Sequence, residues 1–255
     1  MKPIREANRI TQVWRQCGPN AYPIDLSQAV TEIINRSSNG DQLALETRPL
    51  DSLDGALVRT GEKTWCAVVN ENIRNVGRRN FTIAHEVGHF IGHRHLQNNF
   101  EDSAEQLHDF AGDPLEKEAN EFAAQLLMPQ DIIRPYARKN FDIPSLENVT
   151  TELAVSKQAA GLRWVNVSTK LVGFVVSRDG FVIWGRASDL AFQRSVYFKS
   201  GDALPHLSAT LTAQKSKMNC GRRHIAGVWH EIMRCNEDVY FASGDYTYSC
   251  LEYFD

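Results

Sequence analysis

A histidine and glutamate group in the middle of the chain has the spacing of a catalytic metal site. The segment from Arg78 to His95 reads RRNFTIAHEVGHFIGHRH and contains the pattern HExxH, formed by His85, Glu86 and His89. Two histidines four residues apart leave the same face of a helix and can bind one metal ion. Glu86 can then take a proton from a water whose pKa the ion lowers to about 7, as in zinc peptidases.

The residues around this pattern indicate a buried helix. Apolar and small residues lie on several of its sides: Phe81, Ile83, Ala84, Val87, Gly88 and Ile91. The alternative interpretation is two core histidines beside a surface glutamate. It would require three polar residues to be buried at ligand spacing without a ligand, so the metal site is favoured.

Catalytic zinc normally has three protein ligands, so a third must be sought outside HExxH. One candidate is His95, because HEVGHFIGHRH also fits the longer pattern HExxHxxGxxH, in which Gly92 turns the chain. The other candidate is Glu116, which lies in LEKEANEFAAQLLMP, a segment with apolar residues at helical spacing.

Helix geometry favours Glu116. Ala119 and Asn120 follow it at three and four residues and share its face. This face would carry a carboxylate for the metal, a small residue that lets two helices approach, and an amide that can hold a ligand histidine. Glu118 points away from the same face.

The longer pattern also requires a methionine in a turn beneath the metal. Met128 is instead expected to end a regular helix before Pro129. We therefore prefer Glu116 to His95 as the third ligand. His93 and His95 would then lie at the end of the metal helix, near free carbonyl groups.

The preceding residues predict the elements that position this helix. We expect one helix over residues 3–17 and another after the capping residue Asp25, followed by three short strands in QLALET, GALVR and TWCAVVN. TWCAVVN is the candidate edge strand, which could hold an extended substrate through backbone hydrogen bonds. Residues 97–114, including His108 as a surface residue, predict a loop over the site.

The second half of the chain predicts a helix pair and a small α+β region. Residues 145–167 suggest two helices around a short turn, but they carry few basic residues, so direct nucleic-acid binding is disfavoured. Residues 171–186 predict a hairpin with Asp179-Gly180 in its turn, and later strands are expected near 195–198, 238–243 and 246–254. The predicted domains are 1–140 for the metal site, 141–168 as a helical connector and 169–255 as a candidate sensory domain.

The composition argues against functions that need only a charged or apolar surface, so the function must depend on a specific site. The 255 residues include 42% hydrophobic and 23% charged residues with a net charge of −3, which argues against nonspecific binding to nucleic acid or membranes. No apolar run reaches the roughly 20 residues of a membrane span, and the first residues are too polar for a signal peptide. The five cysteines are scattered, so neither disulfides nor a zinc ribbon is expected, and we expect a cytoplasmic protein.

The sequence resembles the ImmA/IrrE metallopeptidases. The resemblance lies in RRNFTIAHEVGHFIGH and EKEANEFAAQLLMP, preceded by DGALVR and TWCAVVN, with a weaker likeness in LAVSKQAAGLRWVN and VGFVVSRDGFVIW. It implies a zincin-like α+β domain and a cytoplasmic zinc endopeptidase that relieves repression by cleaving a DNA-bound helix-turn-helix repressor. It assigns His85, His89 and Glu116 as zinc ligands and Glu86 as the general base.

Two questions stay open at this point. An electrophilic group should stabilise the oxyanion during peptide cleavage, and Tyr136, just beyond the Glu116 helix, is the candidate. The alternative function is a DNA-binding or toxin-antitoxin regulatory protein in which the peptidase fold acts by binding alone.

Overall fold

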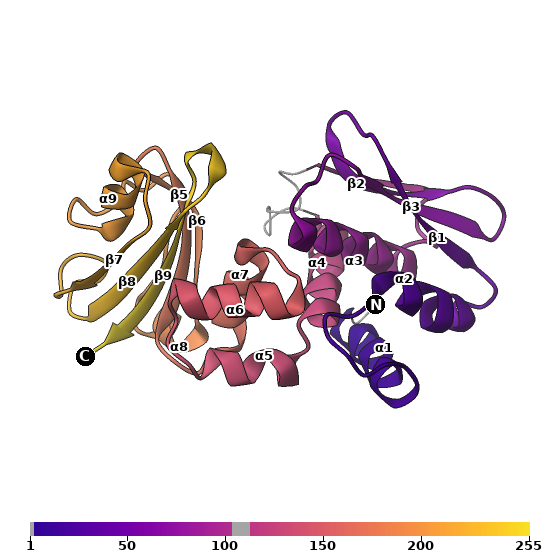
Figure 1. The fold of residues 1–255 in the computed structure, drawn as a ribbon, viewed down its shortest axis with the longest axis horizontal. Coiled ribbons are helices and arrows are strands. Elements are labelled where there is room, and N and C mark those ends of the chain that lie inside the picture. The colour runs from indigo at the N-terminus through magenta and orange to yellow at the C-terminus, as the bar shows by residue number, and fades with distance from the viewer. Residues whose placement is uncertain (1–2, 104–112) are drawn as a thin grey trace. The chain divides into compact units, whose positions relative to one another are not determined.

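The chain forms two compact units, each with its own sheet. A computed structural model describes residues 3–103 and 113–255. One unit comprises Met1–Pro129 with Glu152–Ser156, and the other Gln130–Thr151 with Lys157–Asp255. The α+β class predicted from the sequence is confirmed (Figure 1). The predicted boundaries at 140 and 168 do not coincide with this division, because most of the helix pair groups with the C-terminal sheet.

The first unit contains a four-stranded sheet in the order β1-β3-β2-β4. Its strands are β1 (Gln42–Arg48), β2 (Leu53–Arg59), β3 (Thr64–Asn70) and β4 (Asn99–Ser103). β3 is parallel to β1 and antiparallel to β2, and β2 is also antiparallel to β4. The three predicted strands are present, and a fourth joins them.

Two sequence predictions about this sheet are wrong. TWCAVVN is β3, an interior strand rather than an edge, since β1 and β2 pair with its two sides and six of its seven residues are buried. The segment predicted as a loop supplies β4, in which Phe100 is buried between exposed Asn99 and Glu101. Residues 104–112 of that predicted loop, including His108, lie outside the described residues.

Among the residues that the structure describes, four α-helices accompany this sheet. They are α1 (Pro3–Cys17), α2 (Leu26–Ala29), α3 (Val76–Gly92) and α4 (Pro114–Leu127), and short π and 3₁₀ turns continue α2 to Ser37. The predicted cap Asp25 accepts a hydrogen bond from the Gln28 amide at 3.0 Å. Asn75 accepts one from the Arg78 amide at 2.9 Å and so fixes the start of α3.

Helix α3 packs against β2 and β3 on one side and against α4 on another. Its first turn is joined to β2 by an ion pair, in which Arg78 Nε donates to Asp54 Oδ2 at 2.9 Å. Further along, a Cβ atom on Gly88 would lie 3.1 Å from Ala119 Cα. The two helix backbones therefore touch, as the small residue Ala119 led us to expect.

The second unit contains a five-stranded antiparallel sheet in the order β6-β5-β9-β8-β7. In chain order its elements are α5 (Gln130–Ala137), most of α6 (Ile143–Leu153), α7 (Lys157–Val167), β5 (Val172–Arg178), β6 (Phe181–Ala187), α8 (Asp189–Gln193), α9 (Ala209–Ser216), β7 (Cys220–His224), β8 (Arg234–Phe241) and β9 (Thr247–Phe254). Within the described residues, no helix has the length and apolar composition needed to cross a bilayer.

The predicted hairpin is β5 and β6, and the φ angles of Asp179 and Gly180, 53° and 83°, are typical of its two-residue turn. The strand predicted at 195–198 is absent, and β7, with the sequence CGRRH, was missed because it has no apolar alternation.

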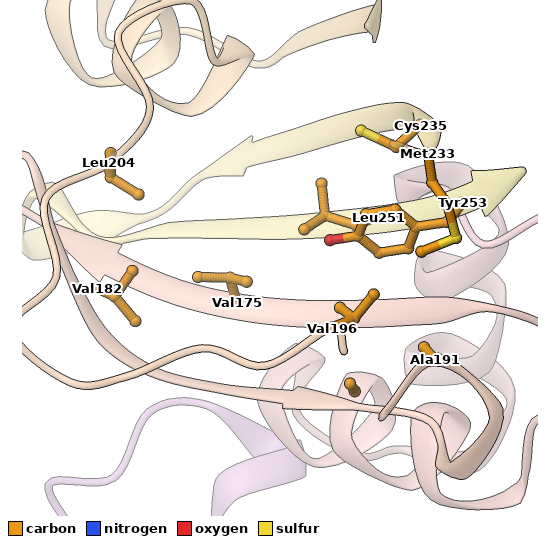
Figure 2. Close-up of a cluster of buried hydrophobic side chains, with 10 residues drawn as sticks. Val175, Val182, Ala191, Val196, Leu204, Met233, Cys235, Leu251 and Tyr253 are labelled. Carbon is orange, nitrogen blue, oxygen red and sulfur yellow. The ribbon is translucent and has the colours of Figure 1, made fainter. Parts of the chain in front are cut away.

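Both faces of this sheet are covered. Phe174 of β5 lies against α7, where a Cβ atom on Gly161 would be 2.6 Å from its ring. The next residue, Val175, faces the opposite side and packs with Leu251 and Tyr253 of β9 and with Leu204 (Figure 2). Successive residues of a strand point to opposite faces, so β5 contributes to both cores.

Replacing Gly77 by alanine should destabilise the first unit. The added Cβ would lie 2.1 Å from the Val155 carbonyl carbon and 2.3 Å from the Ser156 nitrogen, which are backbone atoms that cannot rotate away. We expect urea denaturation to show a loss of about 1–3 kcal/mol in the free energy of unfolding. Val76→Ala, at the neighbouring position with 59% exposure, should change it by less than about 0.5 kcal/mol. Equal stability of the two variants would contradict this packing.

Candidate metal centre

Three side chains from two helices converge in the first unit. His85 and His89 of α3 are fully buried, and Glu116 of α4 has a side chain that is 17% exposed. Nε2 of His85 lies 3.1 Å from one Glu116 carboxylate oxygen, and Nε2 of His89 lies 3.3 Å from the other. The two Nε2 atoms are 2.9 Å apart. Within the described part of the chain, this is the group of His, Cys, Asp and Glu side chains close enough to hold a metal ion.

The fold explains why Glu116 is ionised here. Glu116 lies in the first turn of α4, where the helix dipole favours a negative charge. Burial by itself would raise the pKa of this carboxyl group. Hydrogen bonds with His85 and His89 outweigh burial, so its pKa is held well below the usual value. The group therefore presents an anionic oxygen ligand beside two imidazoles.

Asn120 orients the first histidine. Its Oδ1 atom lies 3.0 Å from His85 Nδ1, which is the contact expected for an amide that holds a ligand histidine. Because an amide oxygen only accepts hydrogen bonds, Nδ1 carries the ring proton. With its ring held in this way, His85 Nε2 would be the atom that offers its lone pair to a metal ion.

The second histidine contacts another histidine. His89 Nδ1 lies 3.0 Å from His93 Nδ1, and His93 Nε2 lies 3.2 Å from Glu118 Oε2. His93 was predicted to meet free carbonyls, and this was wrong, because its ring lies between two side chains. Burial, the largest effect, lowers the pKa of His93. The sequence held a signal for His93, since it continues the four-residue spacing of His85 and His89 along one helix face.

Glu86 lies between α3 and the sheet. It is fully buried, and a Cβ atom on Gly55 of β2 would lie only 2.4 Å from its Oε1 atom. The Glu86 carboxylate therefore occupies the space that a side chain at position 55 would need, and only glycine leaves this space open. Gly55 was not singled out in the sequence, because nothing local marks it as a neighbour of Glu86.

The other two predicted site residues lie outside the group. His95 is exposed after the end of α3. Tyr136 lies partly buried on α5, in the second unit, where Lys139 Nζ is 5.1 Å from the centroid of its ring. Its role in stabilising an oxyanion stays a prediction.

The donor set fits zinc. Zinc binds imidazole nitrogen and carboxylate oxygen at about 2.0–2.2 Å, so tetrahedral ligands lie roughly 3.3 Å apart. The separations of 2.9, 3.1 and 3.3 Å between the three donors are close to that value. Softer metals prefer thiolates, and none of the three donors is a cysteine.

Part of the chain is similar to a known peptidase family. Residues 42–165 match the Peptidase M78 family, described as the IrrE N-terminal-like domain. This match confirms the resemblance drawn from the sequence for that part of the chain. An immunity region protein of Bacillus phage phi105 is 33% identical over 99 residues, which is 38% of this chain. The chain spans about 60% of the length of that relative.

Zinc affinity should separate the two candidates for the third ligand. We expect Glu116→Ala to weaken zinc binding by about 100-fold or more, because structural zinc sites with four protein ligands have apparent binding energies of roughly 10–16 kcal/mol, which is about 3 kcal/mol for each ligand. His95→Ala should bind zinc like the parent protein. Competition with a chromogenic chelator measures both affinities. A loss confined to the His95 variant would show that the third ligand is misassigned.

Proposed function

We propose that this chain, whose residues 42–165 are similar to the IrrE N-terminal-like domain, is a zinc-dependent endopeptidase. The observation that supports this most strongly is the convergence of His85, His89 and Glu116, with Glu86 buried on the same helix. Two imidazoles and one carboxylate are the ligand set of hydrolytic zinc sites that keep a position open for chemistry.

Each residue has a distinct part in this reaction. Zinc held by the three ligands would polarise the scissile carbonyl and make water more acidic. Glu86 takes the proton of the attacking water and later gives it to the leaving amine. Its side chain is shielded from bulk water, and the absence of a side chain on Gly55 leaves space for its carboxylate.

Edge strand β4 is the proposed binding place for the substrate. It pairs with β2 on one side, and within the described residues no strand pairs with its other side. Phe100 of β4 stacks on the His89 ring with centroids 4.5 Å apart, which places this edge beside the ligands. An extended peptide could add to the edge through backbone hydrogen bonds. The sequence had predicted this substrate-binding role for TWCAVVN, which is β3, and we now propose it for β4.

The proposed substrate is a DNA-binding repressor of the helix-turn-helix type, whose cleavage relieves repression. The resemblance implies this substrate, and the similarity to a protein of a phage immunity region supports a regulatory role. The net charge of −3 also favours a protein partner over direct nucleic-acid binding.

Glu86→Gln should separate metal binding from catalysis. We expect this variant to hold zinc like the parent and to cleave a cognate repressor about 10²–10⁴-fold more slowly, since glutamine cannot accept the proton. Glu121→Gln, at an exposed position of α4, is the matched control and should cleave normally. Timed digestion on gels gives the rates. Parent-like cleavage by Glu86→Gln would refute the mechanism, and a regulatory effect that survives without cleavage would favour action by binding alone.

Gly55→Ala tests the position of the base without altering any polar group. The added methyl would collide with Glu86 Oε1, and a displacement of about 1 Å can cost about 100-fold in rate. We expect parent-like zinc content with cleavage slowed to that extent. Val58→Ala, in the same strand, controls for a general effect on β2 and should retain most of the activity. If Gly55→Ala cleaved at the parent rate, the strand would have no part in holding Glu86.

A further inference from the structure

A second set of polar contacts leads from the metal centre toward the protein surface. It begins at His89, passes through His93 and ends at Glu118 of α4. His93 is 2% exposed, and the Glu118 side chain is 34% exposed. The proposed reaction uses neither residue, although both are polar and one is deeply buried.

The directions of the hydrogen bonds follow from the chemistry of the rings. His89 Nε2 faces Glu116 and must keep its lone pair to bind a metal, so its ring proton is on Nδ1. That Nδ1 donates to His93 Nδ1 at 3.0 Å. His93 accepts at Nδ1, so its own proton is on Nε2, which donates to the Glu118 carboxylate at 3.2 Å. Each ring nitrogen of His89 and His93 is thus either a hydrogen-bond donor, a hydrogen-bond acceptor or the atom that would bind the metal.

The two ligand histidines are supported differently. His85 donates to the neutral amide of Asn120, whereas His89 is linked through His93 to an anion. A carboxylate behind a ligand histidine fixes the orientation of the ring and makes it a stronger ligand. Here His93 lies between the two residues and connects the Glu118 carboxylate to the His89 ring through two hydrogen bonds.

The surroundings of His89 restrict its ring further. Phe100 stacks on it with centroids 4.5 Å apart and ring planes inclined by 26°. Stacking fixes the plane of the His89 ring, but a half-turn about the Cβ–Cγ bond would keep the same plane and turn Nδ1 away from His93. The hydrogen bond between His89 Nδ1 and His93 Nδ1 selects one of these two orientations.

We propose that His93 and Glu118 are positioning residues, which orient His89 and strengthen its bond to zinc through the hydrogen-bonded series Glu118, His93, His89. The inference rests on the proposed function, because it requires zinc at His85, His89 and Glu116. It assigns to His93, which caps the C-terminal end of α3, a role that neither HExxH nor the longer pattern contains.

Zinc affinity measured by chelator competition tests the proposal without any substrate. Glu118→Ala and His93→Gln should each bind zinc about 10–100-fold more weakly than the parent. Glu121→Ala, on the same helix, and His95→Gln, an exposed histidine, are the matched controls and should bind like the parent. Glu118→Gln keeps an oxygen acceptor but loses the charge, so its affinity should lie between those of the parent and Glu118→Ala.

NMR detection of the histidine ring nitrogens gives a second test. The protonation of these nitrogens would not change if His93 and Glu118 only stabilised the fold. The zinc-loaded parent should show protonated Nδ1 on His89 and protonated Nε2 on His93. Glu118→Ala should shift the His93 Nε2 proton and speed its exchange with water, while Glu121→Ala should leave it unchanged. An opposite tautomer on His93 in the parent would overturn the inference.

The outcomes separate this inference from the proposed function. If the parent binds zinc and cleaves its substrate while Glu118→Ala binds zinc equally well, only the positioning role is wrong. If zinc affinity falls as expected but the parent cleaves nothing, the positioning role stands and the peptidase function fails. Should His93→Gln not fold, Glu118→Ala decides, because its side chain is partly exposed. A parent that binds no zinc would refute both.

Discussion

The close contact between α3 and α4 is the constraint on which the metal centre depends. Gly88 meets the Ala119 backbone, where even one added carbon would lie 3.1 Å from Ala119 Cα. At this separation Glu116 reaches His85 with one carboxylate oxygen and His89 with the other. A larger residue at either contact would part the helices, and a side chain as short as glutamate could not bridge the gap.

The four-stranded sheet positions α3 and the Glu86 side chain that it carries. The ion pair between Arg78 and Asp54 ties the start of α3 to β2, and Gly55 beside it leaves room for the Glu86 carboxylate. Helix α3 is therefore held by two partners. Contact with α4 brings Glu116 to His85 and His89, while contact with β2 places Gly55 beside Glu86.

Local patterns could be predicted from the sequence, and long-range pairing could not. HExxH, the face shared by Glu116 and Asn120, and the two-residue hairpin turn are each encoded within a few residues, and the contacts formed there agree with expectation. The interior position of β3 depends on its pairing with β1 and β2, which its own residues do not specify. β4 was read as a loop for a similar reason, because an edge strand needs little apolar pattern.

Anomalous diffraction from crystals of the zinc-loaded protein tests the central claim most directly. Data collected on both sides of the zinc absorption edge locate the ion independently of any assumed ligand. We expect one peak within bonding distance of His85 Nε2, His89 Nε2 and a Glu116 oxygen, with His93 Nδ1 still hydrogen-bonded to His89. A peak coordinated by His95 in place of Glu116, or no zinc between α3 and α4, would contradict it.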